Sequence, residues 1–316
     1  MRAAAAMSAQ AQAAVLAPVL DRLRQLCDFG PVTGDLDELP DVDLLVTGWG
    51  CPPITEQVLR RLPSLKAIVH TAGSVKGFVT DACWDRGIAV SSAAPANAVP
   101  VAEYALAMIL LSGKRVLERA RDYRETGQMG LYDVPGTVGN FRTTVGVLSA
   151  SLVGRRVVEL LRPHDFHVLV HDPFVSCVDG AESVSLTDLF RRSDVVTVHT
   201  PLLHETRGLV SRELLGLLRD DAVLINTARG AVVDQDALAD EAGRIRAVLD
   251  VTDPEVLPPE HPLWHNENVL ITPHLAGSQG NEWGRLAEHA VAEVRRWAGG
   301  EPFATPVPAE RREHIA

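Results

Sequence analysis

The chain has 316 residues, of which 46% are hydrophobic and 22% are charged, so its length and composition predict a globular protein of two domains. Its formal net charge of -11 argues against nonspecific binding to nucleic acid, which depends on clustered lysine and arginine. The four cysteines form no C-x-x-C pair, which argues against a disulfide scaffold and predicts reduced thiols in a cytoplasmic protein.

The first part of the chain predicts a small α/β domain. Polar residues interrupt the alanine-rich start, residues 1–14, so we expect no signal peptide. No apolar run reaches the length that a membrane span needs, and we expect no membrane partner. The predicted elements are a helix over 15–26, strands over 43–47, 67–70 and 88–91, and helices over 55–62 and 79–86.

Turn-forming residues follow these strands, and ligands of open α/β sheets bind at the carboxyl ends of the strands. The backbone N–H groups of Ala72, Gly73 and Ser74 therefore form a candidate anion site; the alternative is that Gly73 only makes the turn. Further along, Asn97 is either a substrate contact or the cap of the next helix.

A long helix is predicted over 99–119, with Pro100 in its first turn and apolar residues at helical spacing. Such a helix is suited to bridge two domains. Residues 121–141 are polar and glycine-rich with little periodicity, which is typical of a crossing loop or an oligomer arm.

The rest of the chain predicts a larger α/β domain. Six strands that alternate with helical patterns indicate a doubly wound parallel sheet. An amphipathic helix over 281–297 and a tail over 301–316 complete the chain. The six predicted strands cover 145–148, 167–171, 195–199, 223–226, 247–250 and 269–272.

The turn after strand 145–148 occupies the position of a dinucleotide-binding loop, in which glycines and a helix N-terminus receive the pyrophosphate. The pattern G-x-G-x-x-G is degenerate here, because Ser149 and Ser151 replace the first two glycines and only Gly154 remains. Left-handed backbone at a serine costs on the order of 1 to 2 kcal/mol. We still expect binding, since the Ser151 hydroxyl can donate to phosphate.

Asp172 ends the next strand, and a carboxylate there binds ribose hydroxyls and repels a 2′-phosphate, so the sequence favours NAD over NADP. The alternative is that Asp172 caps the turn at Pro173. His261 and His265 have the spacing of helical metal ligands, but Pro262 lies between them, and we predict no metal site.

Three polar residues lie just past strand ends of the second domain: Arg229, Glu255 and His274. The planar guanidinium of arginine can hold a substrate carboxylate and polarise a keto oxygen. Histidine can give that oxygen a proton as hydride arrives from a nicotinamide, and a carboxylate on its other nitrogen fixes the tautomer and raises the imidazole pKa. The three residues together suit the reduction of a 2-keto acid.

These residues and their surroundings resemble the D-isomer-specific 2-hydroxyacid dehydrogenase family, over about residues 62–280. The resemblance places the catalytic arginine, glutamate and histidine of the family on Arg229, Glu255 and His274. The segments that carry it are AEYALAMIL (102–110), VTVHTPLLHETRGLV (196–210), INTARGAVVDQDAL (225–238), LDVTDPEVLP (249–258) and NVLITPHLAGS (268–278).

The resemblance implies the remaining site residues. Substrate loops fall on residues 72–74 and on Asn97. The implied cofactor contacts are Ser149, Ala150, Ser151, Leu152, Val153, Gly154, Asp172, His199, Thr200, Thr227, Ala228, Asp250, Ala276 and Gly277.

The resemblance also implies a domain organisation. A smaller, flavodoxin-like substrate domain is expected to form from residues 1–112 and 285–316, with a Rossmann-type dinucleotide-binding domain over 113–284. A homodimer and a cleft that closes by hinge motion are implied as well. The sequence departs from the family pattern at Lys76, at Leu152 and at Val256, where an acidic residue, a basic residue and a proline are usual.

Two hypotheses about function follow. The first is an NAD-dependent dehydrogenase that acts on CH–OH donors and interconverts a small, anionic 2-keto acid and its 2-hydroxy acid. The second is a non-enzymatic NAD-sensing or interaction protein on the same fold, as in corepressors that resemble this family, and the substitutions at Ser149 and Ser151 motivate it.

Overall fold

The computed structural model describes residues 1–130 and 134–309 and divides into two compact units. The first unit holds residues 1–98 together with the chain from Ser278 onward, and the second holds Val99–Gly277. Both divisions fall earlier in the chain than 112/113 and 284/285, the boundaries expected from the sequence. The first differs because Ala102, Ala105 and Ile109 pack into the core of the second unit. The second differs because Trp283 packs against the core of the first.

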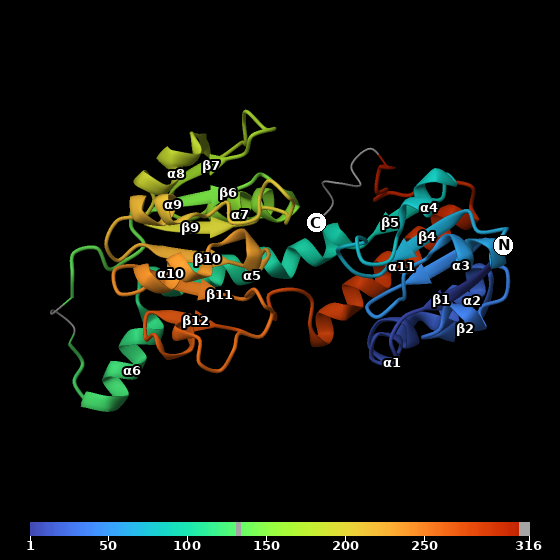
Figure 1. Cartoon of the computed structure of the whole chain (residues 1–316), viewed down its shortest axis with the longest axis horizontal. Helices are drawn as coiled ribbons and strands as arrows, with labels where there is room; N and C mark the ends of the chain where they lie inside the picture. The colour runs from blue at the N-terminus through green and yellow to red at the C-terminus, as the bar shows by residue number, and fades with distance from the viewer. Residues whose placement is uncertain (131–133, 310–316) are drawn as a thin grey trace. The chain divides into compact units, whose positions relative to one another are not determined.

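The first unit contains a five-stranded parallel sheet in the order β2-β1-β3-β4-β5, which is flavodoxin-like (Figure 1). Its helices cover both faces of the sheet. The strands are β1 (Arg2–Ala6), β2 (Asp28–Thr33), β3 (Leu44–Thr47), β4 (Ala67–His70) and β5 (Ala89–Ser92), and the helices are α1 (Ala9–Ala11), α2 (Leu20–Leu26), α3 (Glu56–Arg61), α4 (Asp81–Asp85) and α11 (Trp283–Ala298).

The alanine-rich start of the chain is an interior strand, β1, although the sequence predicted no strand there. Ala3 and Ala5 face the core beneath α2 and α11, whereas Ala4 and Ala6 face the core beneath α3. Alanine is uncommon in strands and common in helices, so propensity gave no signal. The strand is buried because a parallel sheet is covered on both faces.

The predicted tail is partly ordered against the first unit, which corrects the expectation for residues 301–309. Phe303 is buried and stacks on Trp297, and the Val307 N–H donates to the Val90 carbonyl at 2.8 Å. The remaining residues of the predicted tail, 310–316, lie outside the described part of the chain.

The second unit contains a seven-stranded parallel sheet in the order β12-β11-β10-β9-β6-β7-β8. The strand order reverses between β6 and β9: β7 and β8 extend the sheet on one side of β6, and β9 to β12 extend it on the other, as in doubly wound dinucleotide-binding folds. All six predicted strands are present, and β8 is additional. The strands are β6 (Thr144–Leu148), β7 (His167–His171), β8 (Glu182–Ser183), β9 (Val195–Val198), β10 (Val223–Asn226), β11 (Arg246–Leu249) and β12 (Val269–Ile271).

Helices cover both faces of this sheet as well. One core lies beneath α5 and α7, and the other lies beneath α8, α9 and α10. The bounds of the helices are α5 (Ala94–Gly113), α6 (Val116–Thr126), α7 (Leu152–Leu161), α8 (Leu186–Arg192), α9 (Arg212–Leu217) and α10 (Gln235–Glu241).

The single long helix predicted over 99–119 is two helices, α5 and α6. Left-handed backbone at Arg115 (φ 48°) separates them, and an Arg115–Asp221 ion pair at 2.7 Å holds this joint. Helix α5 starts at Ala94, so Asn97 lies inside it and is not its cap. By length and composition alone α5 would suffice to cross a membrane, contrary to the expectation above, although its residues Ala102, Ala105 and Ile109 are buried in the core of the second unit.

Two histidines of the first unit, the buried His70 and the partly buried His289, are held neutral. Burial lowers the pKa of His70 to about 3 and that of His289 to about 4, and the nearby His289 contributes to the shift at His70. Nδ1 of His70 lies 3.0 Å from Thr47 Oγ1, and Nε2 of His289 lies 2.7 Å from Thr305 Oγ1. Neither ring has an acidic partner among these contacts.

Because these histidines are neutral in the folded protein, we expect the unfolding free energy to fall in mild acid. The pKa of an unfolded histidine is about 6.5, so below that pH the unfolded chain binds more protons than the folded chain. The unfolding free energy is therefore fully retained above pH 6.5 and falls as the pH drops, by about 2 kcal/mol per buried histidine at pH 5. Urea unfolding at pH 7 and pH 5 measures this, and His70→Gln is expected to remove its share of the difference. An unchanged difference would contradict the account.

Candidate active site

The three predicted catalytic residues follow three adjacent strands of the second unit. Arg229 follows β10, Glu255 follows β11 and His274 follows β12, and these strands are neighbours in the sheet. Because parallel strands end at one edge, the side chains collect there. Oε1 of Glu255 lies 2.5 Å from Nδ1 of His274, which is the carboxylate–imidazole contact that the sequence predicted.

This contact leaves one ring nitrogen for chemistry. Glu255 engages Nδ1 and fixes the imidazole tautomer, so that Nε2 is the ring nitrogen left for a further hydrogen bond. The two side chains are 57% and 51% exposed, which leaves the pair open to a small molecule that approaches from solvent. Thr252 Oγ1 lies 2.8 Å from the carbonyl oxygens of both Pro254 and Glu255 and supports the loop that carries the carboxylate.

Arg229 is partly buried and lies near the same pair. Burial lowers its pKa and the negative charge of Glu255 opposes this shift, and a guanidinium stays protonated at neutral pH. Its backbone is fixed by Asn226, whose Nδ2 donates to the Arg229 carbonyl at 3.0 Å and whose Oδ1 accepts from the Ala228 N–H at 3.0 Å. The side chain donates through Nη1 to the Ala228 carbonyl at 2.6 Å, which leaves further guanidinium donors for an anion.

Close backbone packing brings the arginine and glutamate segments together. A Cβ atom on Gly230 would lie 2.0 Å from the carbonyl carbon of Thr252, so only glycine fits next to the loop that carries Glu255. Gly230, Asn226 and Thr252 were not among the site residues predicted from the sequence. Asn226 and Gly230 lie in the same INTARG segment as Arg229, and Thr252 lies in the LDVTDPEVLP segment with Glu255, which is the only signal that the sequence offered for them.

His274 has a left-handed backbone, with φ 52°, which is uncommon for a residue other than glycine. Its N–H donates to the carbonyls of Asp250 and Thr272. The carboxylate of Asp250, predicted as a cofactor contact, is 1% exposed and accepts from Thr272 Oγ1 and from the N–H groups of Leu275 and Ala276. Asp250 therefore builds the loop around His274.

The degenerate glycine loop has the left-handed geometry that a glycine would favour. Ser149 has φ 80°, and its hydroxyl donates to Oδ2 of Asp172 at 3.0 Å. The Ala150 N–H donates to the same oxygen at 2.8 Å, and Oδ1 accepts from Phe174 N–H. The carboxylate expected to bind ribose hydroxyls is thus held against the loop, and its oxygens keep capacity to accept further hydrogen bonds.

Ser151 plays a different part from the one predicted. Its hydroxyl donates to the His199 carbonyl at 2.9 Å and accepts from the Gly154 N–H, so that it caps α7 and is already engaged within the protein. Gly154 is confined, because a Cβ there would lie 2.0 Å from the Ser149 carbonyl oxygen. Leu152, in the first turn of α7, is 55% exposed.

The other predicted cofactor residues lie at the same edge of the sheet. His199 and Thr200 follow β9 and are buried, and burial lowers the pKa of His199 to about 3, so its ring is neutral. The ring lies 2.9 Å from Thr197 Oγ1 and 3.4 Å from Thr227 Oγ1. Of the remaining predicted cofactor contacts, Val153 lies in α7, Ala228 follows β10, and Ala276 and Gly277 follow β12.

This edge fits a dinucleotide. The N-terminus of α7 follows β6 directly, which is where a pyrophosphate binds in this topology, and Asp172 ends the neighbouring β7, where a ribose binds. Gly154 keeps the strand-to-helix turn tight. No group of three histidine, cysteine or carboxylate side chains is placed to hold a metal ion within residues 1–130 and 134–309.

The predicted substrate loops lie in the first unit. The turn of residues 72–74 follows β4, and a Cβ on Gly73 would lie 3.7 Å from Nδ2 of Asn97, so the two predicted segments are adjacent. Oδ1 of Asn97 accepts from the Ser278 N–H at 2.9 Å. Trp49, after β3, is 43% exposed at the same sheet edge.

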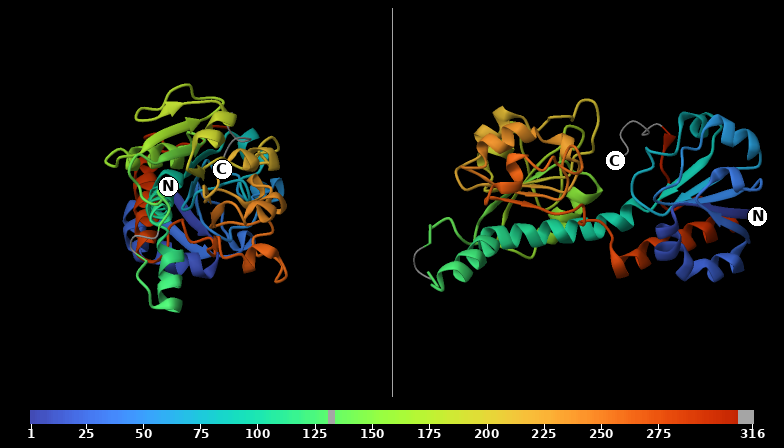
Figure 2. Two further views of the ribbon diagram at one scale, coloured as in Figure 1. Left: turned by 90° about the vertical axis from the view of Figure 1, so that its left-hand side faces the viewer. Right: turned by 60° about the horizontal axis from the view of Figure 1, so that its bottom comes forward.

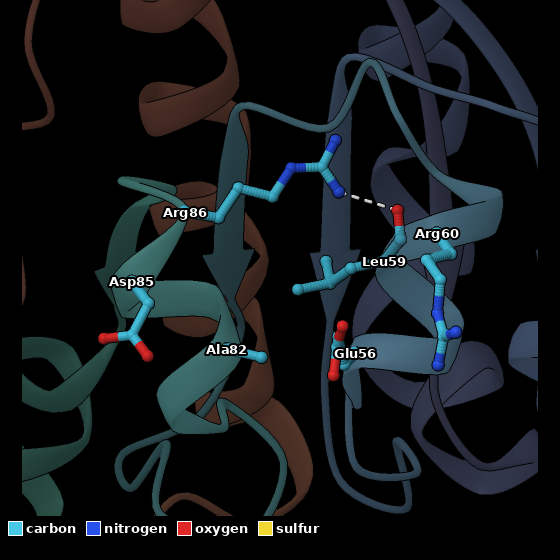
Figure 3. A pocket seen from close by; sticks show the side chains of 6 residues that line it. All are labelled: Glu56, Leu59, Arg60, Ala82, Asp85 and Arg86. Atoms are coloured by element: carbon cyan, nitrogen blue, oxygen red, sulfur yellow. Dashed lines mark hydrogen bonds between the residues drawn. The ribbon is translucent and has the colours of Figure 1, made fainter.

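Two pockets lie apart from these residues. One of about 430 Å³ lies between α3 and α4 in the first unit, where Arg86 donates to the Leu59 carbonyl at 2.6 Å (Figure 3). Glu56, Arg60 and Asp85 give its lining both signs of charge, and none of the predicted site residues reaches it. The other, about 150 Å³, lies beneath α5 and α6 beside Arg246.

Comparison with known proteins agrees with this geometry. The family model described as "D-isomer specific 2-hydroxyacid dehydrogenase, NAD binding domain" matches residues 106–276. The chain is 30% identical over 278 residues to the D-3-phosphoglycerate dehydrogenase of Mycobacterium leprae, and the match covers 84% of this chain and 51% of that protein. The chain thus spans about half the length of this relative.

Other relatives match along most of their length. The chain is 30% identical over 282 residues to the glyoxylate reductase of Korarchaeum cryptofilum, covering 84% of this chain and 82% of that protein. The crystal structure of D-lactate dehydrogenase from Aquifex aeolicus, complexed with NAD and lactic acid, superposes with a TM-score of 0.72 and 26% identity over 95% of this chain and 96% of that chain. With the family model across its second unit and these relatives across both, this chain belongs to the D-isomer specific 2-hydroxyacid dehydrogenase family.

Proposed function

We propose that this protein is an NAD-dependent oxidoreductase that transfers a hydride between NAD(H) and C2 of a small 2-keto or 2-hydroxy acid. The observation that carries the proposal is the Glu255–His274 contact at 2.5 Å beside the cationic Arg229. These residues lie at the edge of the sheet in the unit that matches the NAD-binding domain of the family. The substrate of this proposal is a small anion, because the positive charge of Arg229 attracts a negatively charged group such as a carboxylate.

In this mechanism each residue acts on a defined atom of the substrate. The Arg229 guanidinium binds the substrate carboxylate and polarises the keto oxygen. When bound, the nicotinamide supplies the hydride to C2 or accepts it. His274 Nε2 gives its proton to the keto oxygen during reduction and takes it back during oxidation. Glu255 holds Nδ1 and stabilises the positive imidazolium that is present before the proton leaves.

A specific observation favours the second hypothesis, a non-enzymatic NAD-sensing or interaction protein with weakened cofactor binding. The hydroxyls of Ser149 and Ser151 are engaged with Asp172 and with the His199 carbonyl, so neither is free for the pyrophosphate. The catalytic group supports the enzyme over this alternative, because a sensing protein has no need for a carboxylate on Nδ1 of His274.

One experiment separates the two hypotheses. Purified protein is mixed with NADH and a panel of 2-keto acids that includes glyoxylate, hydroxypyruvate and phenylpyruvate, and NADH consumption is followed by absorbance. Calorimetry measures NADH binding in the same preparation. Turnover with one or more of the acids supports the enzyme. Binding of NADH without turnover supports the NAD-sensing protein. The absence of both rejects the enzyme and the NAD-sensing role, and leaves the interaction protein.

We also propose that the protein is a cytoplasmic homodimer. Free cysteines at all four positions are compatible with a reducing compartment. Helix α6 supports self-association, because it extends away from the sheet of its unit (Figure 2) and contains no buried residue. Its apolar residues Leu117 and Tyr123 are 47% and 56% exposed.

Substitution in α6 is expected to dissociate the dimer. A charge at Leu117, as in Leu117→Asp, places an unpaired carboxylate in the proposed apolar contact and should raise the dissociation constant by at least about tenfold. Light scattering coupled to gel filtration measures the mass of both proteins, and circular dichroism checks that the variant is folded. A wild-type protein that is monomeric at micromolar concentration would contradict the proposal.

A further inference from the structure

A chain of hydroxyl groups links helix α5 to the loop that carries His274. The Tyr104 hydroxyl lies 2.8 Å from Thr272 Oγ1, and Thr272 Oγ1 lies 2.6 Å from Oδ1 of Asp250. All three residues belong to the second unit. Neither Tyr104 nor Thr272 contacts Glu255 in these hydrogen bonds, so any effect on the catalytic pair passes through the loop.

The direction of these hydrogen bonds follows from the carboxylate of Asp250, which is the last acceptor in the series. An ionised Asp250 can only accept, so Thr272 donates its hydroxyl proton to Oδ1. The oxygen of Thr272 then accepts from the Tyr104 hydroxyl, which therefore acts as the donor. Burial, and to a smaller extent the negative charge of Asp250, raise the pKa of Tyr104, so the phenol keeps its proton at neutral pH.

Asp250, the last acceptor in this series of hydrogen bonds, also shapes the backbone at His274. Asp250 accepts from the N–H groups of Leu275 and Ala276, and its carbonyl accepts from the His274 N–H. These bonds hold His274 at φ 52°. A left-handed residue other than glycine persists only where its surroundings fix it, so the orientation of Asp250 decides the direction of the imidazole.

Packing alone does not require the hydroxyl. Tyr104 packs against the apolar core beneath α5, which also contains Ala105, Val145 and Ile225. Phenylalanine would fill the same place in this core. The hydroxyl adds a contact to Thr272 from a helix whose buried face is fixed in the sheet unit, and that contact gives the His274 loop a rigid support.

We propose that Tyr104 is a positioning residue for the reaction, which acts through Thr272 and Asp250 to hold His274 in the orientation that faces the substrate. The inference rests on the proposed function. It goes beyond the catalytic group because Tyr104 contacts neither His274 nor Glu255 in the hydrogen bonds described. A purely structural hydroxyl would affect stability alone, whereas a positioning hydroxyl affects the proton-transfer step.

Kinetics of matched variants test the proposal. In Tyr104→Phe we expect kcat to fall by at least about tenfold, with the KM of the keto acid and the affinity for NADH within twofold of wild type. Thr272→Val should match it, and Thr272→Ser should retain the wild-type kcat because it keeps the hydroxyl. The kcat of the double variant Tyr104→Phe/Thr272→Val should fall no further than that of either single variant, since both substitutions break the same series of hydrogen bonds. The control Thr187→Val, at an exposed position of α8, should be unaffected.

A second readout needs neither substrate nor cofactor. Nitrogen-15 NMR of the ring nitrogens of His274 reports the bond to Glu255 in the free protein, and we expect its signal to shift in Tyr104→Phe and not in Thr187→Val. If wild type shows no turnover, the proposed function fails while this measurement still decides the positioning role. A wild-type kcat in Tyr104→Phe, or an unchanged His274 signal, would overturn the proposal.

Discussion

Alanine in place of Gly154 is expected to lower the affinity for NADH at least about tenfold, which corresponds to about 1.4 kcal/mol. A Cβ at this position would lie 2.0 Å from the backbone oxygen of Ser149, so the loop between β6 and α7 must move. Overpacking of this kind also lowers the unfolding free energy by about 1 to 3 kcal/mol. Calorimetry with NADH and urea unfolding measure the two effects.

The matched control is Gly216→Ala in α9 of the same unit, where an added Cβ meets no atom within 4 Å. This variant should bind NADH as wild type does and should be slightly more stable, because alanine is the better helix former. Equal NADH affinity in Gly154→Ala and Gly216→Ala would show that the loop after β6 does not hold the cofactor.

Replacement of His274 is expected to have the largest effect on catalysis. His274→Ala removes the proton donor, and kcat should fall about 10²- to 10⁴-fold, the usual contribution of a positioned acid or base. NADH affinity should stay within twofold, because the change lies at the proton-transfer step. Steady-state kinetics with the best keto acid of the panel and calorimetry with NADH measure these quantities.

Two further variants define the role of this histidine. Glu255→Gln keeps a polar group at Nδ1 but removes its charge, so the imidazolium loses support and kcat for reduction should fall, while the affinity for NADH stays as in wild type. His167→Ala, at the opposite end of β7 in the second unit, should leave kcat unchanged. A wild-type kcat in His274→Ala would remove the histidine from the mechanism.

The sequence predicted the parts of the fold that depend on periodic apolar runs. All six predicted strands of the second unit are present, because each lies in a short apolar segment between turns, and Val195–Val198 is a fully buried example. The predicted group of Arg229, Glu255 and His274 also lies together, because parallel strands present their carboxyl ends at one edge.

Other features depend on packing that no local pattern reveals. The alanines of β1 are in a strand only because two layers of helices cover the sheet on both sides. Arg115 divides the predicted long helix through an ion pair with Asp221, which is distant in sequence. Asn97 contacts Ser278 across the chain and caps no helix.

The orientation of the side chains in the degenerate loop also could not be predicted from the sequence. The hydroxyl of Ser151 was expected at the pyrophosphate, yet it donates to the His199 carbonyl and caps α7. Serine readily forms such local bonds to backbone, and the partner from β9 is set by the strand order. The contact between Tyr104 and Thr272 and the close packing of Gly230 against Thr252 could not be predicted for the same reason, since these partners are remote in the chain.

The most direct test of the central claim follows the hydride itself. The protein is incubated with NADH deuterated at C4 of the nicotinamide, in each of its two stereochemical forms, and with the best keto acid of the panel, and the product is analysed by NMR. We expect one of the two forms of NADH to transfer its deuterium to C2 of the product. A product without deuterium from either form would contradict the proposed hydride transfer.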